Sequence, residues 1–293
     1  MSGYSIDGVS DDVLKNKLGA TTHDELQRLE APLVAARYTE IEAGLGPSGD
    51  FDTEHLKAIH RYLFQDVYEW AGHTRDETVR LSDGTFATEP FMHKGDTSFT
   101  PGPAIASALD EVARSLRERE YLRDLPREQF ARAGADVIIQ INGIHAFREG
   151  NGRTQRVFME ELARKAGHTL EFSVVSQERM IEASIAANER DDPSLMRRLF
   201  DEISNPHRVE VLRTAEDALD RNRFDWNERY IATVEPGHPV DLTMVGIARD
   251  QFMAHTGSQI LIGKTSDLPK PHPDRGETFT FVASKHCWQS ETT

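Results

Sequence analysis

Apolar side chains recur three and four positions apart through most of the first two thirds of the chain, from about residue 23 to residue 204. Such spacing lines one face of an α-helix, so we expect a helical bundle here. Asp52 or Thr53 would cap one of these helices. The clearest stripes are Leu56, Ile59, Leu63 and Val67, and Ile105, Leu109, Val112 and Leu116. We assign these residues to the core.

Two of the expected helices, at residues 127–142 and 151–166, are separated by a short connection at residues 145–150. Gly167 should end the second helix, because glycine readily adopts the left-handed conformation found at helix C-termini. The connection between these helices is therefore the first place to look for chemistry.

Residues 78–100 interrupt the helical pattern. This stretch is rich in threonine and is broken by Gly84, Pro90 and Gly95. It also contains Ser82-Asp83-Gly84, a turn signal between two short strand-like runs. We therefore predict a β-hairpin inserted in the helical domain.

The pattern of apolar and polar residues changes again after Asn205-Pro206. Alternating or β-rich segments separated by Gly and Pro turns predict strands. They lie at residues 229–235, 240–248, 259–263 and 278–282. We therefore expect two domains, a helical one at residues 1–205 and a small, mainly β one at residues 207–293.

Composition narrows the class of protein. Of 293 residues, 38% are hydrophobic and 28% are charged, and no apolar run is long enough to span a bilayer. The polar first ten residues do not resemble a secretory signal. Cys287 is the single cysteine, which excludes an internal disulfide and a cluster of several thiolates. We expect a globular protein that folds in a cytosol and has no membrane partner.

The formal net charge of -15 argues against a general nucleic-acid binder, because such proteins neutralise phosphates with Lys and Arg. A protein or small-molecule substrate is the better expectation. ATP is compatible with an acidic surface, since a triphosphate needs only a local cluster of donors and a metal ion.

The connection and the start of the next helix carry residues suited to a polyphosphate. Gly150 and Gly152 allow successive backbone N–H groups to converge on an anion, at a helix N-terminus whose dipole also favours phosphate. Arg153 and Arg156 lie three residues apart near one helix face, so both guanidinium groups would reach the same ligand. The segment predicts an anion cradle.

Two further residues suggest a reaction. Glu149, beside the cradle, is suited to hold Mg²⁺ that bridges phosphate oxygens. A neutral His145 would accept the proton of an attacking hydroxyl. Phe147 is expected to anchor the loop in the core. A lone histidine or a lone Gly-Asn-Gly is more often structural, so the prediction depends on their occurrence together with an acid and two arginines within twelve residues.

This segment resembles the Fic motif, His-Pro-Phe-x-Asp/Glu-Gly-Asn-Gly-Arg-x-x-Arg, with Ala146 in place of the usual proline. Loss of the proline ring changes loop rigidity by about 1 kcal/mol at most. The resemblance implies a helical bundle that binds Mg-ATP as follows: His145 as base, Glu149 on Mg²⁺, Gly150, Asn151 and Gly152 in the anion hole with Arg148 beside them, and Arg153 and Arg156 on the distal phosphates.

In the family, the hairpin is a flap that pairs with an extended segment of the target protein. Lys94 and Gly95 correspond to a Lys-Gly pair that contacts the nucleotide there, although a solvated surface lysine explains Lys94 equally well. The resemblance therefore implies a protein partner that docks on the residue 78–100 hairpin.

A Fic core followed by a β domain resembles the Bartonella effector proteins and related type IV secretion substrates, in which the second domain is an OB fold. The resemblance implies a toxin or effector, located in a bacterial cytoplasm or translocated into a recipient or host cell. The family's inhibitory motif, Ser/Thr-x-x-x-Glu-Gly/Asn, is missing. Its nearest match, at residues 21–25, is followed by Leu26. This implies restraint by a small separate inhibitory protein, with internal restraint by the flap or β domain as the alternative.

The implied activity is transfer of AMP from Mg-ATP to a Ser, Thr or Tyr hydroxyl of a target protein. Transfer of phosphate, UMP or phosphocholine on the same scaffold remains an alternative. Gly152 and Arg153 favour AMP, because family members that transfer phosphate differ at the second glycine. A second alternative is an adaptor without catalysis, against which the intact His145 and Glu149 argue.

Overall fold

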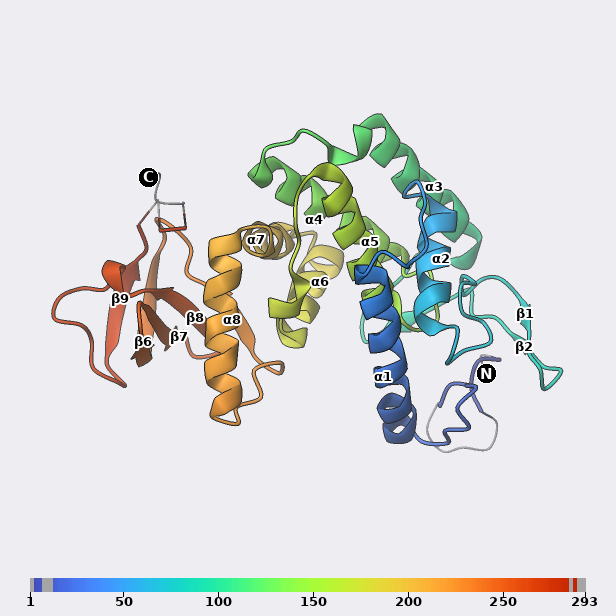
Figure 1. Ribbon diagram of the computed structural model, residues 1–293, viewed down its shortest axis with the longest axis horizontal. Coiled ribbons are helices and arrows are strands. Elements are labelled where there is room, and N and C mark those ends of the chain that lie inside the picture. Colours follow the sequence, from blue (N-terminus) through green and yellow to red (C-terminus); the bar gives the residue numbers. More distant parts are fainter. Residues whose placement is uncertain (1–2, 7–12, 285–286, 289–293) are drawn as a thin grey trace. The chain divides into compact units, whose positions relative to one another are not determined.

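The computed structural model describes residues 3–6, 13–284 and 287–288 (Figure 1). These residues form two compact units, which are described separately. The first unit is drawn from Met1–Asp124 and Asp136–Gly167, and the second from Leu125–Ala135 and His168–Thr293. No helix among the described residues is long and apolar enough to cross a membrane.

The first unit is built from helices around a shared apolar core. They are α1 (His23–Glu42), α2 (Thr53–Phe64), α3 (Gly102–Glu118), the second half of α4 (Arg127–Ile144), from Asp136 on, and α5 (Asn151–Ala166), with a 3₁₀ turn η1 (Glu120–Leu122). Asp52 caps α2 by accepting a hydrogen bond from the N–H of His55. Gly167 ends α5 with φ 83°. Both predicted stripes are buried, which confirms their assignment to the core.

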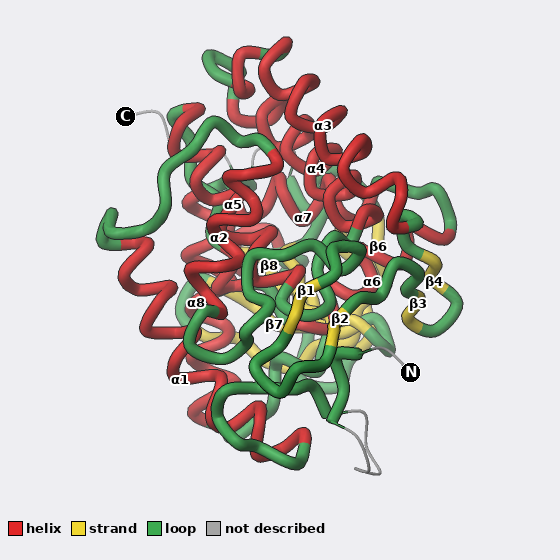
Figure 2. Tube along the Cα trace, turned by 90° about the vertical axis from the view of Figure 1, so that its right-hand side faces the viewer, coloured by secondary structure: helices red, strands yellow, loops and turns green. Residues whose placement is uncertain are grey.

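The interruption at residues 78–100 forms two short antiparallel ladders, seen in yellow in Figure 2. The first pairs β1 (Val79–Arg80) with β2 (Phe86–Ala87), and the second pairs β3 (His93–Lys94) with β4 (Thr97–Ser98). Gly84 has φ 83° and donates its N–H to the carbonyl of Leu81, as the turn signal predicted. The hairpin is confirmed, and the second ladder is an addition that the sequence did not indicate. We call residues 78–100 the flap.

The second unit combines helices with one sheet (Figure 1). Its helices are η2 (Phe172–Val174), α6 (Gln177–Glu189), α7 (Ser194–Ile203) and α8 (Pro206–Arg221), with η3 (Thr265–Asp267) between strands. The segment from residue 207 therefore opens with a helix and not with a strand. Asn205 caps α8 with its side chain, and Pro206 occupies the first turn. The dipeptide at which the sequence pattern changes is therefore the start of a helix.

The sheet has five strands in the order β5-β8-β7-β6-β9. They are β5 (Tyr230–Thr233), β6 (Pro239–Ala248), β7 (Gln251–His255), β8 (Gln259–Lys264) and β9 (Thr278–Val282), and only the β5–β8 pair is parallel. Four match predicted strands, and β7 was missed. A bridge between Pro236 and Ala283 links the ends of the two edge strands, as in a partly open barrel. The OB assignment stays a prediction.

A buried cluster of charges connects helices and sheet within the second unit. Glu202 on α7 is fully buried and accepts hydrogen bonds from Arg179 and Arg208, each at 2.7 Å. Arg208 also donates to the hydroxyl of Thr233 on β5 at 2.7 Å. Burial acts to raise the pKa of the Glu202 carboxyl, but Arg179, Arg208 and Arg198 outweigh it and lower the pKa to about 2. The cluster is thus a network of ionised side chains that joins α6, α7, α8 and β5.

Glu216 on α8 has the opposite environment. Its side chain is buried, and Oε1 has no hydrogen-bond partner among the described residues. Burial raises its pKa to about 8, because no arginine contact outweighs the loss of solvent. The folded-state pKa of Glu216 lies above the ordinary value of 4.5. The contribution of the protonated Glu216 to folding stability is therefore complete below pH 4.5 and is lost as pH rises toward 8.

We expect Glu216→Gln to stabilise the protein by roughly 1–3 kcal/mol at pH 8 and by much less at pH 5, because the buried amide stays uncharged at both pH values. Urea unfolding at both pH values measures the difference. Glu210→Gln, at an exposed position of the same helix, is the matched control and should change stability by less than about 0.5 kcal/mol at either pH. An equal effect of Glu216→Gln at both pH values would contradict the assignment.

Candidate active site

The connection between α4 and α5 is held in an unusual backbone conformation. His145 has φ 50° and Gly150 has φ 80°. A Cβ atom at Gly150 would lie 2.4 Å from ring atoms of Phe64, so glycine is required both by the backbone and by the space. Ala146 and Phe147 are buried, and Phe147 anchors the loop in the core as predicted.

The His145 ring is 7% exposed and stacks on Phe99, with ring centroids 3.9 Å apart. Among the described residues, neither ring nitrogen has a hydrogen-bond partner. Burial, followed by the positive charges of Lys94 and Arg75, lowers the pKa of His145 to about 3, while the backbone of Asn142 acts in the opposite direction. The imidazole is therefore neutral near neutral pH, the form in which it accepts a proton.

This pKa predicts a direct result. In an NMR titration of the isolated chain, the His145 ring should keep the chemical shifts of the neutral form between about pH 8 and pH 5, because its folded-state pKa is about 3. Comparison with the spectrum of His145→Ala assigns the signal. A midpoint near the ordinary value of 6.5 would contradict the burial argument.

Both motif arginines lie on α5 beside the loop. Arg153 donates to the carboxylates of Glu30 and Glu149, and its guanidinium lies 4.7 Å from the ring centre of Phe64. Arg156 is half-buried, and its Nε donates to the carbonyl of Gly152 at 3.3 Å. Burial lowers the pKa of Arg156 and the carboxylate of Glu160 opposes the shift. Two guanidinium groups thus lie next to the N-terminus of α5.

The remaining motif residues divide into two groups. Glu149 is half-exposed, and its Oε1 accepts from the N–H of Gly150 at 2.9 Å and from Arg153 at 3.3 Å. Asn151 is buried and forms two hydrogen bonds with the backbone of Phe147, so its side chain holds the loop closed.

Arg148 points to the flap. Its Nε lies 2.6 Å from a carboxylate oxygen of Glu89. Lys94 on β3 is exposed, and its charge acts on His145, which places the flap lysine within electrostatic range of the histidine. Gly95 follows with φ 58° in the turn of the second ladder. The structure therefore links the motif to the flap through Arg148 and Glu89, and the role of Lys94 and Gly95 stays a prediction.

Sequence reasoning missed Arg75, which is fully buried between the loop and the flap. Its guanidinium donates to the carbonyls of His145 at 2.9 Å and Pro90 at 2.8 Å, and also to that of Thr100. Its backbone N–H donates to the carbonyl of Ala146 at 2.8 Å. One side chain thus fixes the catalytic loop and both ends of the second half of the flap.

His60 is a second residue that the sequence did not indicate. It is fully buried and stacks on Phe147 at 3.9 Å. Its Nδ1 accepts from the N–H of Gly72 at 2.8 Å, so Nε2 carries the proton and donates to the carbonyl of Glu149 at 3.0 Å. Burial lowers its pKa to about 3. This neutral histidine supports the backbone of the predicted metal ligand.

Three further histidines lie outside the motif. His73 is exposed and pairs with Glu77 at 2.8 Å, and His93 and His272 are exposed. Within the part of the chain that the structure describes, no group of three or more His, Cys, Asp or Glu side chains is arranged to hold a metal ion. Any cation at this site would need oxygen ligands from a bound molecule as well.

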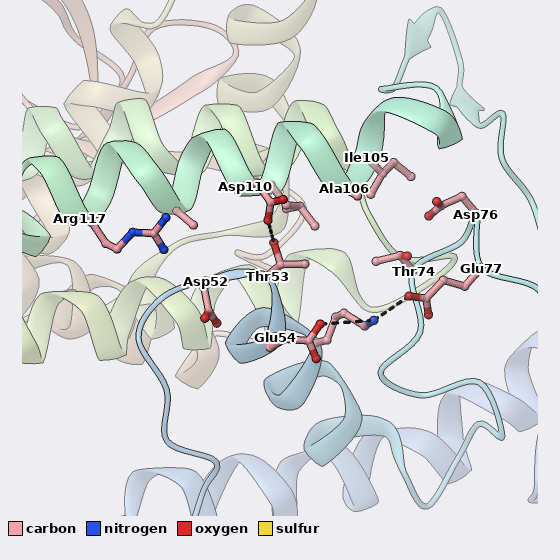
Figure 3. A pocket seen from close by; sticks show the side chains of 13 residues that line it. Asp52, Thr53, Glu54, Thr74, Asp76, Glu77, Ile105, Ala106, Asp110 and Arg117 are labelled. Atoms are coloured by element: carbon pink, nitrogen blue, oxygen red, sulfur yellow. Dashed lines mark hydrogen bonds and ion pairs between the residues drawn. The ribbon is translucent and has the colours of Figure 1, made fainter.

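A cavity of about 400 Å³ lies in the same unit, beside the segment that leads into the flap (Figure 3). Carboxylates dominate its lining, including Asp52, Asp76 and Asp110. Several are already paired: Asp110 accepts from Thr53 at 3.0 Å, and Lys57 binds Glu77 at 2.7 Å. This cavity shares none of its lining residues with the loop at residues 145–156.

Comparison with known proteins points to the same part of the chain. A model of the Fic/DOC family matches residues 50–163, which include the flap and the motif. The probable protein adenylyltransferase y4lH of Sinorhizobium fredii is 36% identical over 174 residues, which is 59% of this chain and 82% of that protein. The chain belongs to the Fic/DOC family. The resemblance expected from the motif is thereby confirmed.

Other Fic/DOC relatives are longer. A protein adenylyltransferase of Bartonella henselae is 35% identical over 244 residues, 80% of this chain and 44% of the relative. The protein adenylyltransferase VbhT of Bartonella schoenbuchensis is 34% identical over 202 residues, 68% of this chain and 39% of the relative. The chain thus spans less than half the length of these two relatives.

Solved structures of Fic proteins are similar to this fold. The type IV secretion system effector protein BepA has a TM-score of 0.89 at 32% identity, covering 96% of each chain. BepC of Bartonella tribocorum, solved with bound AMPPNP, has a TM-score of 0.66 at 35% identity and covers 69% of this chain and 95% of that one. The similarity to BepA confirms the expected fold, a helical Fic core followed by a small β region.

Proposed function

We propose that this chain is a protein adenylyltransferase, which transfers AMP from ATP to a hydroxyl side chain of a target protein. The observation that carries the proposal is the loop at residues 145–156. It combines a neutral, buried His145 with the N-terminus of α5, where Gly150 is the N-cap residue, and with Arg153 and Arg156. The names of Fic/DOC relatives, including y4lH, support the same activity.

In the proposed reaction, His145 accepts the proton of the target hydroxyl as its oxygen attacks the α-phosphorus of ATP. A bond forms between that oxygen and the phosphorus, and the bond from the phosphorus to the bridging oxygen of the β-phosphate breaks. Pyrophosphate leaves with the bond's electron pair, and AMP stays on the target. The backbone at Gly150–Gly152 and the two arginines stabilise the negative charge on the phosphates.

The residues present fit Mg-ATP. Both protein contacts of Glu149 go to Oε1, so among the described residues Oε2 remains for a cation. Mg²⁺ is usually held by one or two carboxylates together with phosphate oxygens, and here it would neutralise charge on those phosphates. Arg148 and Asn151 serve the site by fixing the loop, while Lys94 and Gly95 would face the nucleotide from the flap.

We further infer that the target protein pairs with the flap, that the chain acts as a translocated effector or toxin, and that a small separate protein inhibits it. Effector relatives such as BepA support translocation. Residues 21–25 do not supply an inhibitory glutamate. At the start of α1, the Glu25 carboxylate accepts from the N–H of Thr21 at 3.1 Å, and the Glu25 N–H donates to the side chain of the N-cap residue Thr22.

The test uses ATP labelled separately at the α and γ positions. The chain is incubated with each nucleotide, Mg²⁺ and cell lysates, followed by gel analysis and mass spectrometry. We expect α label on a protein, with the mass of one adenylate added to a Ser, Thr or Tyr. Transfer of γ label alone would replace AMP transfer by phosphorylation, and no transfer of either label would contradict the proposal.

A further inference from the structure

Arg153 of the motif is held by a residue far away in the sequence. Nη1 of Arg153 donates to Oε1 of Glu30, which lies 123 positions earlier on α1. We propose that Glu30 is a positioning residue that orients Arg153 for the nucleotide phosphates. The proposal rests on the assignment of Arg153 to phosphate binding under the proposed function.

Glu30 is itself rigidly placed. Its side chain is only 8% exposed, and its second oxygen, Oε2, accepts a hydrogen bond from the hydroxyl of Tyr68. Tyr68 is 1% exposed, and burial together with the charge of Glu30 raises its pKa. Because both carboxylate oxygens are used and the helix is fixed in the core, Glu30 presents its charge to Arg153 in one direction.

Three contacts then hold the Arg153 guanidinium. Its Cζ lies over the Phe64 ring, 4.7 Å from the ring centre, Nη1 donates to Glu30, and Nη2 donates to Glu149 at 3.3 Å. The two carboxylates differ in burial, since the side chain of Glu149 is 37% exposed and that of Glu30 is 8% exposed. Glu149 is therefore the partner that is free to move toward a cation, whereas Glu30 stays.

The geometry favours orientation by Glu30 over competition with the nucleotide. A guanidinium group has five N–H donors in a planar fork, of which Glu30 uses one Nη1 hydrogen. Glu149 uses one Nη2 hydrogen, which leaves further donors of the fork for a phosphate. A guanidinium group that Glu30 already holds in one orientation loses less conformational freedom when it binds an anion, and this preorganisation tightens binding.

The experiment measures affinity for a non-hydrolysable ATP analogue with Mg²⁺ by calorimetry, using the full chain. We expect Glu30→Gln, which keeps the shape and removes the charge, to weaken binding by about 10-fold. In an Arg153→Ala background the same change should alter affinity less than about 2-fold, because the residue that it orients is absent. Where transfer is also measured, the KM for ATP should rise more than kcat falls.

Two further variants separate positioning from a general structural effect. Tyr68→Phe leaves the Glu30 carboxylate in place but removes its orienting hydroxyl, and should weaken binding in the same direction by about 3-fold. Glu40→Gln is the matched control. Glu40 lies on the same helix and also contacts a tyrosine, Tyr62 at 2.9 Å, and an arginine, Arg37 at 2.8 Å. Its substitution should leave nucleotide affinity unchanged.

Three outcomes would overturn the proposal: tighter binding by Glu30→Gln, unchanged binding, or an equal loss in the Arg153→Ala background. Tighter binding would make Glu30 a competitor of the phosphate. Because the readout is binding, it is independent of the transfer reaction. A chain that binds the analogue with the expected dependence on Glu30, yet transfers no AMP, would sink the proposed activity and leave the role of Glu30 in place.

Discussion

Replacing His145 with alanine is expected to lower the rate of AMP transfer by about 10²–10⁴-fold, the usual contribution of a general base. The physical reason is that the neutral, buried ring at the end of α4 is the group assigned to accept the hydroxyl proton. The measurement is the initial rate of α-label transfer to the target under saturating Mg-ATP.

Two controls make the loss interpretable. His73→Ala removes an exposed histidine of the same unit and should leave the rate within about 2-fold. Nucleotide affinity of His145→Ala, measured by calorimetry, should stay close to that of the parent, since the imidazole acts on the target hydroxyl. A loss of transfer below about 10-fold, with affinity retained, would assign proton transfer to another group.

The second large effect concerns stability. Glu202→Gln is expected to cost roughly 3–5 kcal/mol of unfolding free energy, because it removes the carboxylate paired with the fully buried Arg179 and leaves Arg208 with Asp201 alone. Denaturant unfolding gives the total loss. Hydrogen exchange locates it, and protection should fall first for amides of β5 and β8, since β5 is bonded to the charge cluster and pairs with β8.

The surface pair Glu182–Arg190 in the same unit provides the control, with N···O 2.8 Å and both side chains more than a third solvent-accessible. Glu182→Gln should cost less than about 1 kcal/mol. If both substitutions had the same small effect, the buried cluster would contribute no more than an exposed ion pair, contrary to the argument from burial.

The sequence predicted those features whose signals are local. Helices α4 and α5 and the loop between them were predicted because apolar spacing, glycine and charged residues lie within a few positions of one another. The β1–β2 hairpin followed from its Asp83-Gly84 turn. Strand β7 was missed because apolar Met253 lies between the buried Phe252 and Ala254, so the sequence shows no alternation of apolar and polar residues.

The residues that sequence reasoning did not find act over long distances in the chain. Arg75 reaches His145 across 70 positions, His60 reaches Glu149 across 89, and Glu30 reaches Arg153 across 123. An arginine, a histidine and a glutamate within otherwise ordinary segments carry no pattern of their own. Their roles follow only once the tertiary fold brings buried donors to particular acceptors.

Arg75 has a consequence for how the flap can vary. The acceptors of its guanidinium are main-chain carbonyls, those of His145, Pro90 and Thr100 among them. Every amino acid supplies the same carbonyl, so the bonds that Arg75 makes do not depend on the flap's side chains, whereas Phe99 of the flap does contact the His145 ring. Exposed flap positions such as Phe86 and Phe91 are therefore free to change without disturbing the histidine. The solvent-facing flap side chains and the contacts by which Arg75 holds His145 are thus separate sets of groups.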